Sequence, residues 1–284
     1  MTKKQVFIIA GPTACGKSGF ALDLAEKIKG EIVNADAFQV YQGLRVLTAR
    51  PDEKEMRGIP HHLYGYMDNF SQEDVTGWVQ KAAKVISEIE HPVVVGGTGL
   101  YLSVLMNGIS PMPDISPDTR ALVRQMAPKE VLSKLTQGVV PSDIQRQKRA
   151  LEVLLETGKP IEYFQNLPKK KYVEADFKCI VILPPREKVY DKIEGRLIKM
   201  IEQNCVGEVQ NLLASSASGG VMNAIGVKEL TDFIEKKCDL PTAVERILLA
   251  TRHYAKRQRT WLKHQMPDNA RVIDEPDINK VITL

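Results

Sequence analysis

The sequence has no long apolar run, few cysteines and no strong excess of charge. Its apolar runs, such as residues 6–10, stop far short of the ~18 residues that a membrane helix needs. The charged start Thr2-Lys3-Lys4 precedes only this short run, so we expect no secretion signal. The four cysteines, at positions 15, 179, 205 and 238, lack metal-ligand spacing. They argue against zinc or disulfides and predict a cytoplasmic protein without membrane association.

The charge balance is too mild to predict or exclude a nucleic-acid partner. Lys and Arg number 39 against 35 Asp and Glu, for a net charge of +4. Any basic surface must therefore be sought locally. The 284 residues, 43% of them hydrophobic, are typical of roughly two globular domains, or of one large domain with an insertion. No long heptad pattern or apolar stripe argues for assembly, so we expect a monomer.

Strand and helix patterns alternate in the first third of the chain. We expect buried strands at residues 5–10, 31–35 and 92–95, with helices after the first strand and at 72–90, the latter capped by Ser71. This order predicts a parallel sheet flanked by helices. Ligands gather at the carboxyl ends of such strands.

A proline-rich stretch after residue 110 precedes a segment whose hydrophobic pattern differs from that of the first third of the chain. Strand patterns stop until 177–183, and helical patterns occupy 118–126, 129–136 and 143–157, the last with Ser142 and Gln145 as a capping box. Further helices are expected at 186–204, 205–215, 226–236 and 241–264. We predict a core from residues 1–112 and 175–284, interrupted by a small helical insertion domain at 113–174.

A glycine-rich motif joins the first strand to the first helix. Its residues are Gly11-Pro12-Thr13-Ala14-Cys15-Gly16-Lys17-Ser18, a complete Walker A pattern. Backbone N–H groups, the lysine and the helix dipole would bind phosphate oxygens, and the Ser18 hydroxyl could hold Mg²⁺. Together with the parallel sheet, the motif predicts a P-loop NTPase-like α/β fold. Cys15, at a helix N-terminus, is expected to have a lowered pKa and to oxidise readily.

The second half of an ATPase signature is missing. A Walker B strand ends in an Asp, whereas residues 93–95 run into Gly96-Gly97-Thr98. Either the acid lies elsewhere, as in several small kinases, or pyrophosphate is bound as a leaving group. Asp36, at the end of the neighbouring strand, could accept a proton from a nucleophile or hold magnesium.

Two groups of cations indicate a phosphate-backbone partner. Arg252, Lys256, Arg259 and Lys263 share one face of the C-terminal helix without a carboxylate among them. A second cluster in the insertion holds Arg146, Lys148 and Arg149. Two basic surfaces on a nearly neutral chain predict a clamp for nucleic acid.

With these motifs in place, the chain resembles the tRNA dimethylallyltransferases, also called tRNA isopentenyltransferases. The resemblance spans nearly the whole length and includes Walker A, Ala35-Asp36, Thr48-Ala49-Arg50-Pro51, Gly96-Gly97-Thr98-Gly99, Gln145-Arg146 and Lys256-Arg257-Gln258. The chain departs from the family pattern at Ala37, Leu47 and Val227.

The resemblance implies transfer of a dimethylallyl group from dimethylallyl diphosphate to the exocyclic amine of the adenosine next to the tRNA anticodon. Asp36 would be the base, Thr98 would orient the reactants, and Lys17, Mg²⁺ on Ser18 and Arg257 would stabilise the leaving diphosphate. The residues that the family pattern places on the anticodon stem-loop are Asp36, Ala37, Phe38, Gln39, Thr98, Arg120, Gln145, Arg146, Gln147, Lys148, Arg149, Arg252, Lys256, Arg259 and Lys263.

Three other functions fit parts of the sequence. A P-loop kinase for a small metabolite or nucleotide would use the insertion as a lid, but the missing Walker B acid weakens this kinase interpretation. An adenylate isopentenyltransferase acting on free nucleotide would not need two basic surfaces. A non-catalytic RNA-binding protein has no use for Lys17 and Ser18 facing Asp36.

Overall fold

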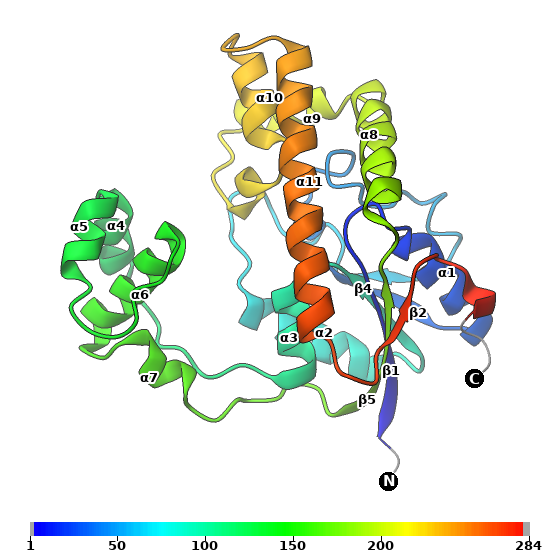
Figure 1. The fold of residues 1–284 in the computed structure, drawn as a ribbon, viewed down its shortest axis with the longest axis horizontal. Coiled ribbons are helices and arrows are strands. Elements are labelled where there is room, and N and C mark those ends of the chain that lie inside the picture. The colour runs from blue at the N-terminus through cyan, green and yellow to red at the C-terminus, as the bar shows by residue number, and fades with distance from the viewer. Residues whose placement is uncertain (1–2, 281–284) are drawn as a thin grey trace. The chain divides into compact units, whose positions relative to one another are not determined.

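The computed structural model describes Lys3 to Lys280, which form two compact units (Figure 1). The first unit combines the described residues up to Met106 with those from Tyr172 onward. The second is the intervening segment Asn107–Lys171. The sequence predicted an insertion over residues 113–174, which overlaps this second unit.

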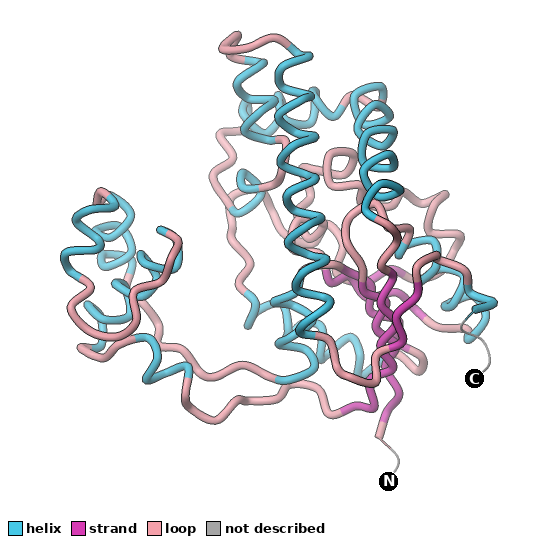
Figure 2. Tube along the Cα trace, viewed as in Figure 1, coloured by secondary structure: helices cyan, strands magenta, loops and turns pink. Residues whose placement is uncertain are grey.

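The first unit is built on a parallel sheet of six strands. The strands are β1 (Lys4–Ala10), β2 (Glu31–Ala35), β3 (His61–His62), β4 (Pro92–Gly96), β5 (Ala175–Ile182) and β6 (Arg271–Ile273). Their order is β3-β2-β4-β1-β5-β6, and each neighbouring pair is parallel. Figure 2 shows these strands gathered in magenta, with cyan helices around them. The predicted α/β class is confirmed. The edge strands β3 and β6, which the sequence did not predict, are two and three residues long.

Helices cover both faces of the sheet because successive strand residues point to opposite sides. On one face, Phe20 and Leu24 of α1 (Lys17–Ile28) pack against Phe7 and Ile9 of β1. On the other lie α2 (Val75–Glu88) and α3 (Gly99–Asn107), where Met106 contacts the Cys179 thiol of β5 at 3.7 Å. Because these strands are parallel, the carboxyl ends of β1, β2 and β4 lie at the same end of the sheet, between the two helix layers.

Four α-helices of the first unit follow β5. They are α8 (Arg186–Glu202), α9 (Cys205–Ala214), α10 (Val227–Ile234) and α11 (Leu240–Gln265). The sequence predicted each to within a few residues. Across the described residues, none of the helices combines the length and apolarity needed to cross a bilayer.

The second unit consists of four helices around a small core of its own. These are α4 (Pro117–Gln125), α5 (Pro128–Lys134), α6 (Ile144–Thr157) and α7 (Ile161–Gln165). Val123, Met126, Val131 and Leu151 form the core. At its base, the backbones of Ile109 and Lys170 exchange two hydrogen bonds.

Two predicted helix caps are wrong, because nearby aspartates compete successfully. Helix α2 begins at Val75, after Asp74, whose carboxylate accepts the Gly77 N–H at 2.6 Å. Asp143, not Ser142, caps α6 by accepting the Arg146 N–H at 2.9 Å. A carboxylate makes a charge-assisted bond and adds a favourable interaction with the helix dipole, so it is the stronger cap.

Trp78 ties the two helices on the second face to β2. Its side chain is fully buried, stacks on Tyr101 of α3 with ring centroids 4.2 Å apart, and donates from Nε1 to the Asn34 carbonyl at 3.1 Å. Trp78→Phe removes that donor, leaves the carbonyl unpaired and opens a small cavity. We expect a loss of about 2 kcal/mol in the free energy of unfolding, measured by urea denaturation. A change under ~0.5 kcal/mol would contradict this role for the indole.

Candidate active site

The glycine loop between β1 and α1 is narrow because its glycines sit where side chains would collide. A Cβ on Gly11 would lie 2.4 Å from the Cys15 sulfur, and Gly16 has a φ of +93°. The Lys17 ammonium is half-buried and donates to the Pro12 carbonyl within the same loop at 3.3 Å. Ser18 is exposed in the first turn of α1. This backbone suits phosphate oxygens, as the motif predicts.

The prediction of a reactive Cys15 is wrong. The side chain is fully buried, and burial raises the pKa of its thiol, outweighing the lowering by Lys17 and Lys192. The neutral thiol contacts the loop from within, so Cys15 acts as a small packing residue at this position.

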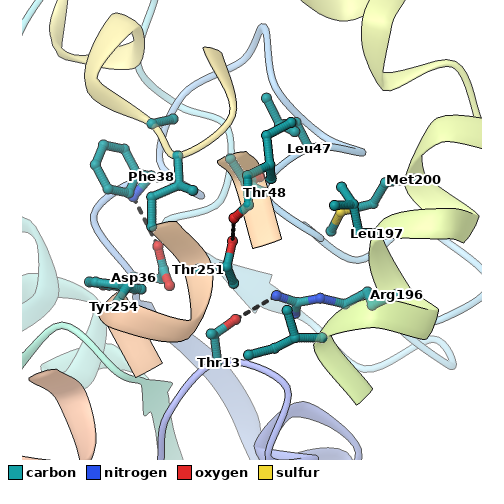
Figure 3. A pocket seen from close by; sticks show the side chains of 14 residues that line it. Thr13, Asp36, Phe38, Leu47, Thr48, Arg196, Leu197, Met200, Thr251 and Tyr254 are labelled. Atoms are coloured by element: carbon teal, nitrogen blue, oxygen red, sulfur yellow. Dashed lines mark hydrogen bonds between the residues drawn. The ribbon is translucent and has the colours of Figure 1, made fainter. Parts of the chain in front are cut away.

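Asp36 is held firmly at the end of β2. The buried Asn34 side chain accepts the Asp36 N–H at 2.9 Å and donates to the carbonyls of Asp36 and Leu63 at 3.0 Å. Asp36 in turn accepts the Phe38 N–H on Oδ1 at 2.9 Å (Figure 3). Oδ1 is thus engaged with the backbone, and the carboxylate lines a pocket.

Thr98, at the end of β4, lies directly beside this segment. Its hydroxyl accepts the Ala37 N–H at 3.1 Å. Tyr254 of α11 also interacts with the Thr98 hydroxyl, and burial, together with the negative charge of Asp36, raises the pKa of that tyrosine. The fold therefore brings Asp36 and Thr98 together, as expected from adjacent strands.

Gln258 of α11 links the glycine loop to the end of β4. It is 5% exposed, accepts the Thr13 N–H on Oε1 at 2.8 Å, and donates from Nε2 to the Gly97 carbonyl at 2.9 Å. A Cβ on Gly97 would lie 2.4 Å from that nitrogen, so glycine is required there. The sequence singled out Gln258 only as part of a family motif and gave it no role.

A largely apolar pocket opens between Asp36 and the glycine loop. Thr13 and Arg196 bound one side, and the Arg196 guanidinium donates to the Thr13 hydroxyl (Figure 3). Burial lowers the pKa of Arg196, and the Asp36 carboxylate opposes that shift. The apolar lining residues are Phe38, Leu47, Ile193, Leu197, Met200, Ala224, Ile225 and Ile247.

Arg196 is the cation that lines this pocket, and it was not predicted from the sequence. No recognisable motif surrounds it, and a lone arginine on a helix is usually solvated. Arg257, predicted to contact the diphosphate, is not among the residues that line the pocket. It is exposed and lies 5.7 Å from the centre of the Tyr254 ring.

The predicted cationic face of α11 divides in two. Lys256, Arg259 and Lys263 line one groove, which Pro12 of the glycine loop also lines. Lys256 and Lys263 are exposed there, while Arg259 donates to the Pro184 carbonyl. Arg252 pairs with Glu194 of α8 at 3.5 Å, so one of the four cations has a carboxylate partner although none lies among them on α11. The partner comes from another helix, which periodicity on α11 cannot reveal.

Among the residues predicted to contact RNA near Asp36, Phe38 lines the pocket and Gln39 braces a loop. The Gln39 side chain donates to the carbonyls of Thr48 and Ala49, both at 2.9 Å. The Gln39 carboxamide nitrogen therefore donates its hydrogen bonds within the protein.

In the second unit, the predicted RNA residues differ in exposure. Arg120, Gln145 and Arg146 are exposed. Gln147 is buried, with its amide donating to the Pro141 carbonyl at 2.7 Å, so the prediction of a surface contact there is wrong. Lys148 and Arg149 are half-buried; Lys148 donates to the Arg124 carbonyl and Arg149 pairs with Glu152.

The residues at the glycine loop fit a magnesium ion that is carried by phosphate. Nowhere in the described part of the chain do three or more His, Cys, Asp or Glu side chains form a metal cage. Ser18 offers an exposed hydroxyl beside the loop amides. Mg²⁺ commonly takes few protein ligands and completes its shell with phosphate oxygens and water, so this donor set suffices.

Comparison with known proteins places this geometry in a family. Residues 39–265 match the sequence profile described as IPP transferase. The tRNA dimethylallyltransferase of Zymomonas mobilis is 38% identical, covering 98% of this chain and 94% of the relative, and that of Rhizobium etli is 39% identical, covering 95% and 97%.

Solved structures agree with the sequence matches. The tRNA isopentenylpyrophosphate transferase of Bacillus halodurans superposes with a TM-score of 0.73 at 28% identity, covering 98% of this chain and 93% of that one. A eukaryotic dimethylallyltransferase acting on tRNA gives a TM-score of 0.80 at 27% identity, covering 98% and 75%. Profile, relatives and fold all agree: the chain belongs to the tRNA dimethylallyltransferase family.

Proposed function

We propose that this protein transfers a dimethylallyl group from dimethylallyl diphosphate to the exocyclic amine of the adenosine next to the tRNA anticodon, releasing diphosphate. The observation that carries the proposal is the apolar pocket between the Thr13–Arg196 pair and Asp36. It offers an anion-binding end, a carboxylate, and a lining suited to a small hydrocarbon group.

At the donor end, the loop amides, Lys17 and Arg196 bind the diphosphate. Negative charge grows on the leaving oxygens as the bond from carbon C1 to oxygen breaks, and preorganised cations and N–H groups stabilise that charge. The Ser18 hydroxyl would hold Mg²⁺, which would supply further neutralisation of the leaving group. Since Gln258 fixes Thr13 against Gly97, the loop is positioned before the donor binds.

At the acceptor end, Asp36 binds and deprotonates the amine. The adenine lone pair is delocalised into the ring, so the amine is a weak nucleophile. With Oδ1 holding the Phe38 N–H, the other carboxylate oxygen is the natural acceptor for an amine hydrogen. The amine forms the new bond to C1 while the electron pair of the broken bond leaves with diphosphate, and the proton passes to Asp36. Thr98 orients the base from the adjoining strand.

An apolar lining also protects the donor. Allylic cation character develops on C1 during departure, and water would capture it. Side chains such as Phe38, Leu197 and Ile225 leave little that can hold a water molecule beside the prenyl group.

The anticodon stem-loop is proposed to bind along the groove of Lys256 and Lys263, with Arg120, Gln145, Arg146, Lys148 and Arg149 as further contacts from the insertion. Pro12 of the glycine loop also lines this groove, which places the groove beside the donor loop. Flipping the adenosine out of its stack costs a few kcal/mol, which these backbone contacts offset. We further propose that the chain acts as a cytoplasmic monomer.

The direct test supplies labelled dimethylallyl diphosphate and Mg²⁺ with bulk tRNA lacking the modification, followed by nucleoside analysis. We expect label on the amine of one adenosine next to the anticodon. Transfer to free adenosine monophosphate instead would indicate an adenylate isopentenyltransferase, and label transfer from the γ-phosphate of ATP would indicate a kinase.

Asp36→Asn tests the proposed base. The amide keeps an oxygen for the Phe38 N–H but accepts a proton poorly, so turnover should fall at least ~10²-fold while tRNA and diphosphate binding persist. Single-turnover rates measure the effect, with Asp176→Asn on the exposed start of β5 as control. An unchanged rate would remove Asp36 from this role.

Lys256→Ala and Lys263→Ala test the RNA groove. Each should weaken tRNA binding and reduce the slope of log K against log salt by about 0.7–0.9, because one phosphate contact is lost. Arg259 is a poorer choice since it bonds the Pro184 carbonyl. Exposed Lys84 of α2 serves as control. Slopes equal to that of Lys84→Ala would show that the two lysines are merely solvated.

A further inference from the structure

Leu47 forms the part of the pocket wall that lies away from the diphosphate end. It belongs to the loop between β2 and β3, and it lines the pocket with Thr48. Figure 3 shows Leu47 and Phe38 on the side opposite to Thr13 and Arg196. A prenyl chain whose diphosphate is bound at Thr13 and Arg196 therefore extends toward Leu47.

The Leu47 side chain has little freedom to move aside. It is 7% exposed and packs on the backbone at the start of α10. A Cβ on Gly226 would lie 2.9 Å from Leu47 Cδ1, and Gly226 has a φ of +98°. The Leu47 side chain is therefore confined between the pocket and the closely packed backbone at Gly226.

The backbone that carries Leu47 is fixed by Glu208 of α9. This single carboxylate accepts the N–H groups of Arg45, Val46 and Leu47 at 3.0, 2.8 and 3.0 Å. Such charge-assisted bonds are stronger than neutral ones. On the other side of the loop, Gln39 holds the carbonyls of Thr48 and Ala49. The wall is rigid in both side chain and backbone.

We propose that Leu47, positioned by Glu208, limits the donor to a five-carbon prenyl group. This inference rests on the proposed function and adds a determinant of donor length. Allylic diphosphates lengthen by five-carbon units at the end remote from C1. Because the wall is rigid, extra carbons would have to displace Leu47 or Gly226, and overpacking of this kind is unfavourable.

The chemistry at C1 is the same for a ten-carbon donor. Its C1–O bond breaks with the electron pair leaving on diphosphate, the adenine amine forms the C–N bond, and Asp36 takes the proton. Discrimination between the five-carbon and ten-carbon donors must therefore arise where their hydrocarbon tails differ. That place is the pocket wall formed by Leu47, not Asp36 or the glycine loop.

The experiment compares dimethylallyl and geranyl diphosphate as donors to tRNA, using kcat/KM for each. Leu47→Ala should raise the ratio of ten-carbon to five-carbon transfer at least tenfold above the wild-type ratio, and volume-conserving Leu47→Met should leave it near wild type. Met200→Ala is the matched control, because Met200 is equally buried and lines the same pocket from α8.

Inhibition by inorganic diphosphate, which has no prenyl tail, separates an effect on the Leu47 wall from a general loss of the folded site. Its inhibition constant should be unchanged in Leu47→Ala. Glu208→Gln should raise the ten-carbon ratio less than Leu47→Ala does, again with unchanged inhibition by inorganic diphosphate. Should Leu47→Ala fail to fold, Leu47→Phe provides the opposite test: KM for the five-carbon donor should rise at least fivefold at constant diphosphate inhibition.

Each outcome bears on one claim. An active wild type with an unchanged donor ratio in folded Leu47→Ala overturns the length limit alone. A larger rise in Met200→Ala than in Leu47→Ala overturns it as well, since the tail would then point toward α8. A wild type inactive with both donors contradicts the proposed function and this inference together.

Discussion

The arrangement of the site depends on one buried amide side chain. Gln258 reaches from α11 between the carboxyl ends of two strands, accepting the Thr13 N–H and donating to the Gly97 carbonyl. It thereby joins the glycine loop to the segment whose next residue, Thr98, holds the Ala37 N–H beside Asp36. Donor and acceptor ends are linked through a short series of hydrogen bonds, all of which are made within the first unit.

Much of this could be predicted from the sequence because the signals are local. The Walker A glycines, the apolar strands and Asp36 at a strand end are short patterns whose geometry follows from a parallel sheet. The family resemblance added the reaction and the RNA partner. Strands β3 and β6 escaped prediction because two or three residues show no period, and their pairing depends on β2 and β5.

The residues that were missed or misjudged depend on contacts between distant segments. Arg196 reaches the pocket only because α8 packs beside the glycine loop. Burial made Cys15 inert and placed Gln147 inside the second unit, neither of which a helix pattern could show. Glu208 acts on a loop more than 160 residues earlier. Such roles follow from tertiary packing rather than from spacing along the chain.

A crystal structure with a non-hydrolysable thio analogue of dimethylallyl diphosphate tests the central claim most directly. The account predicts the diphosphate on the loop amides, Lys17 and Arg196, with C1 directed toward Asp36 and the methyl groups against the apolar lining. A carboxylate that points away from C1, or a donor bound with its diphosphate outside the glycine loop, would contradict it.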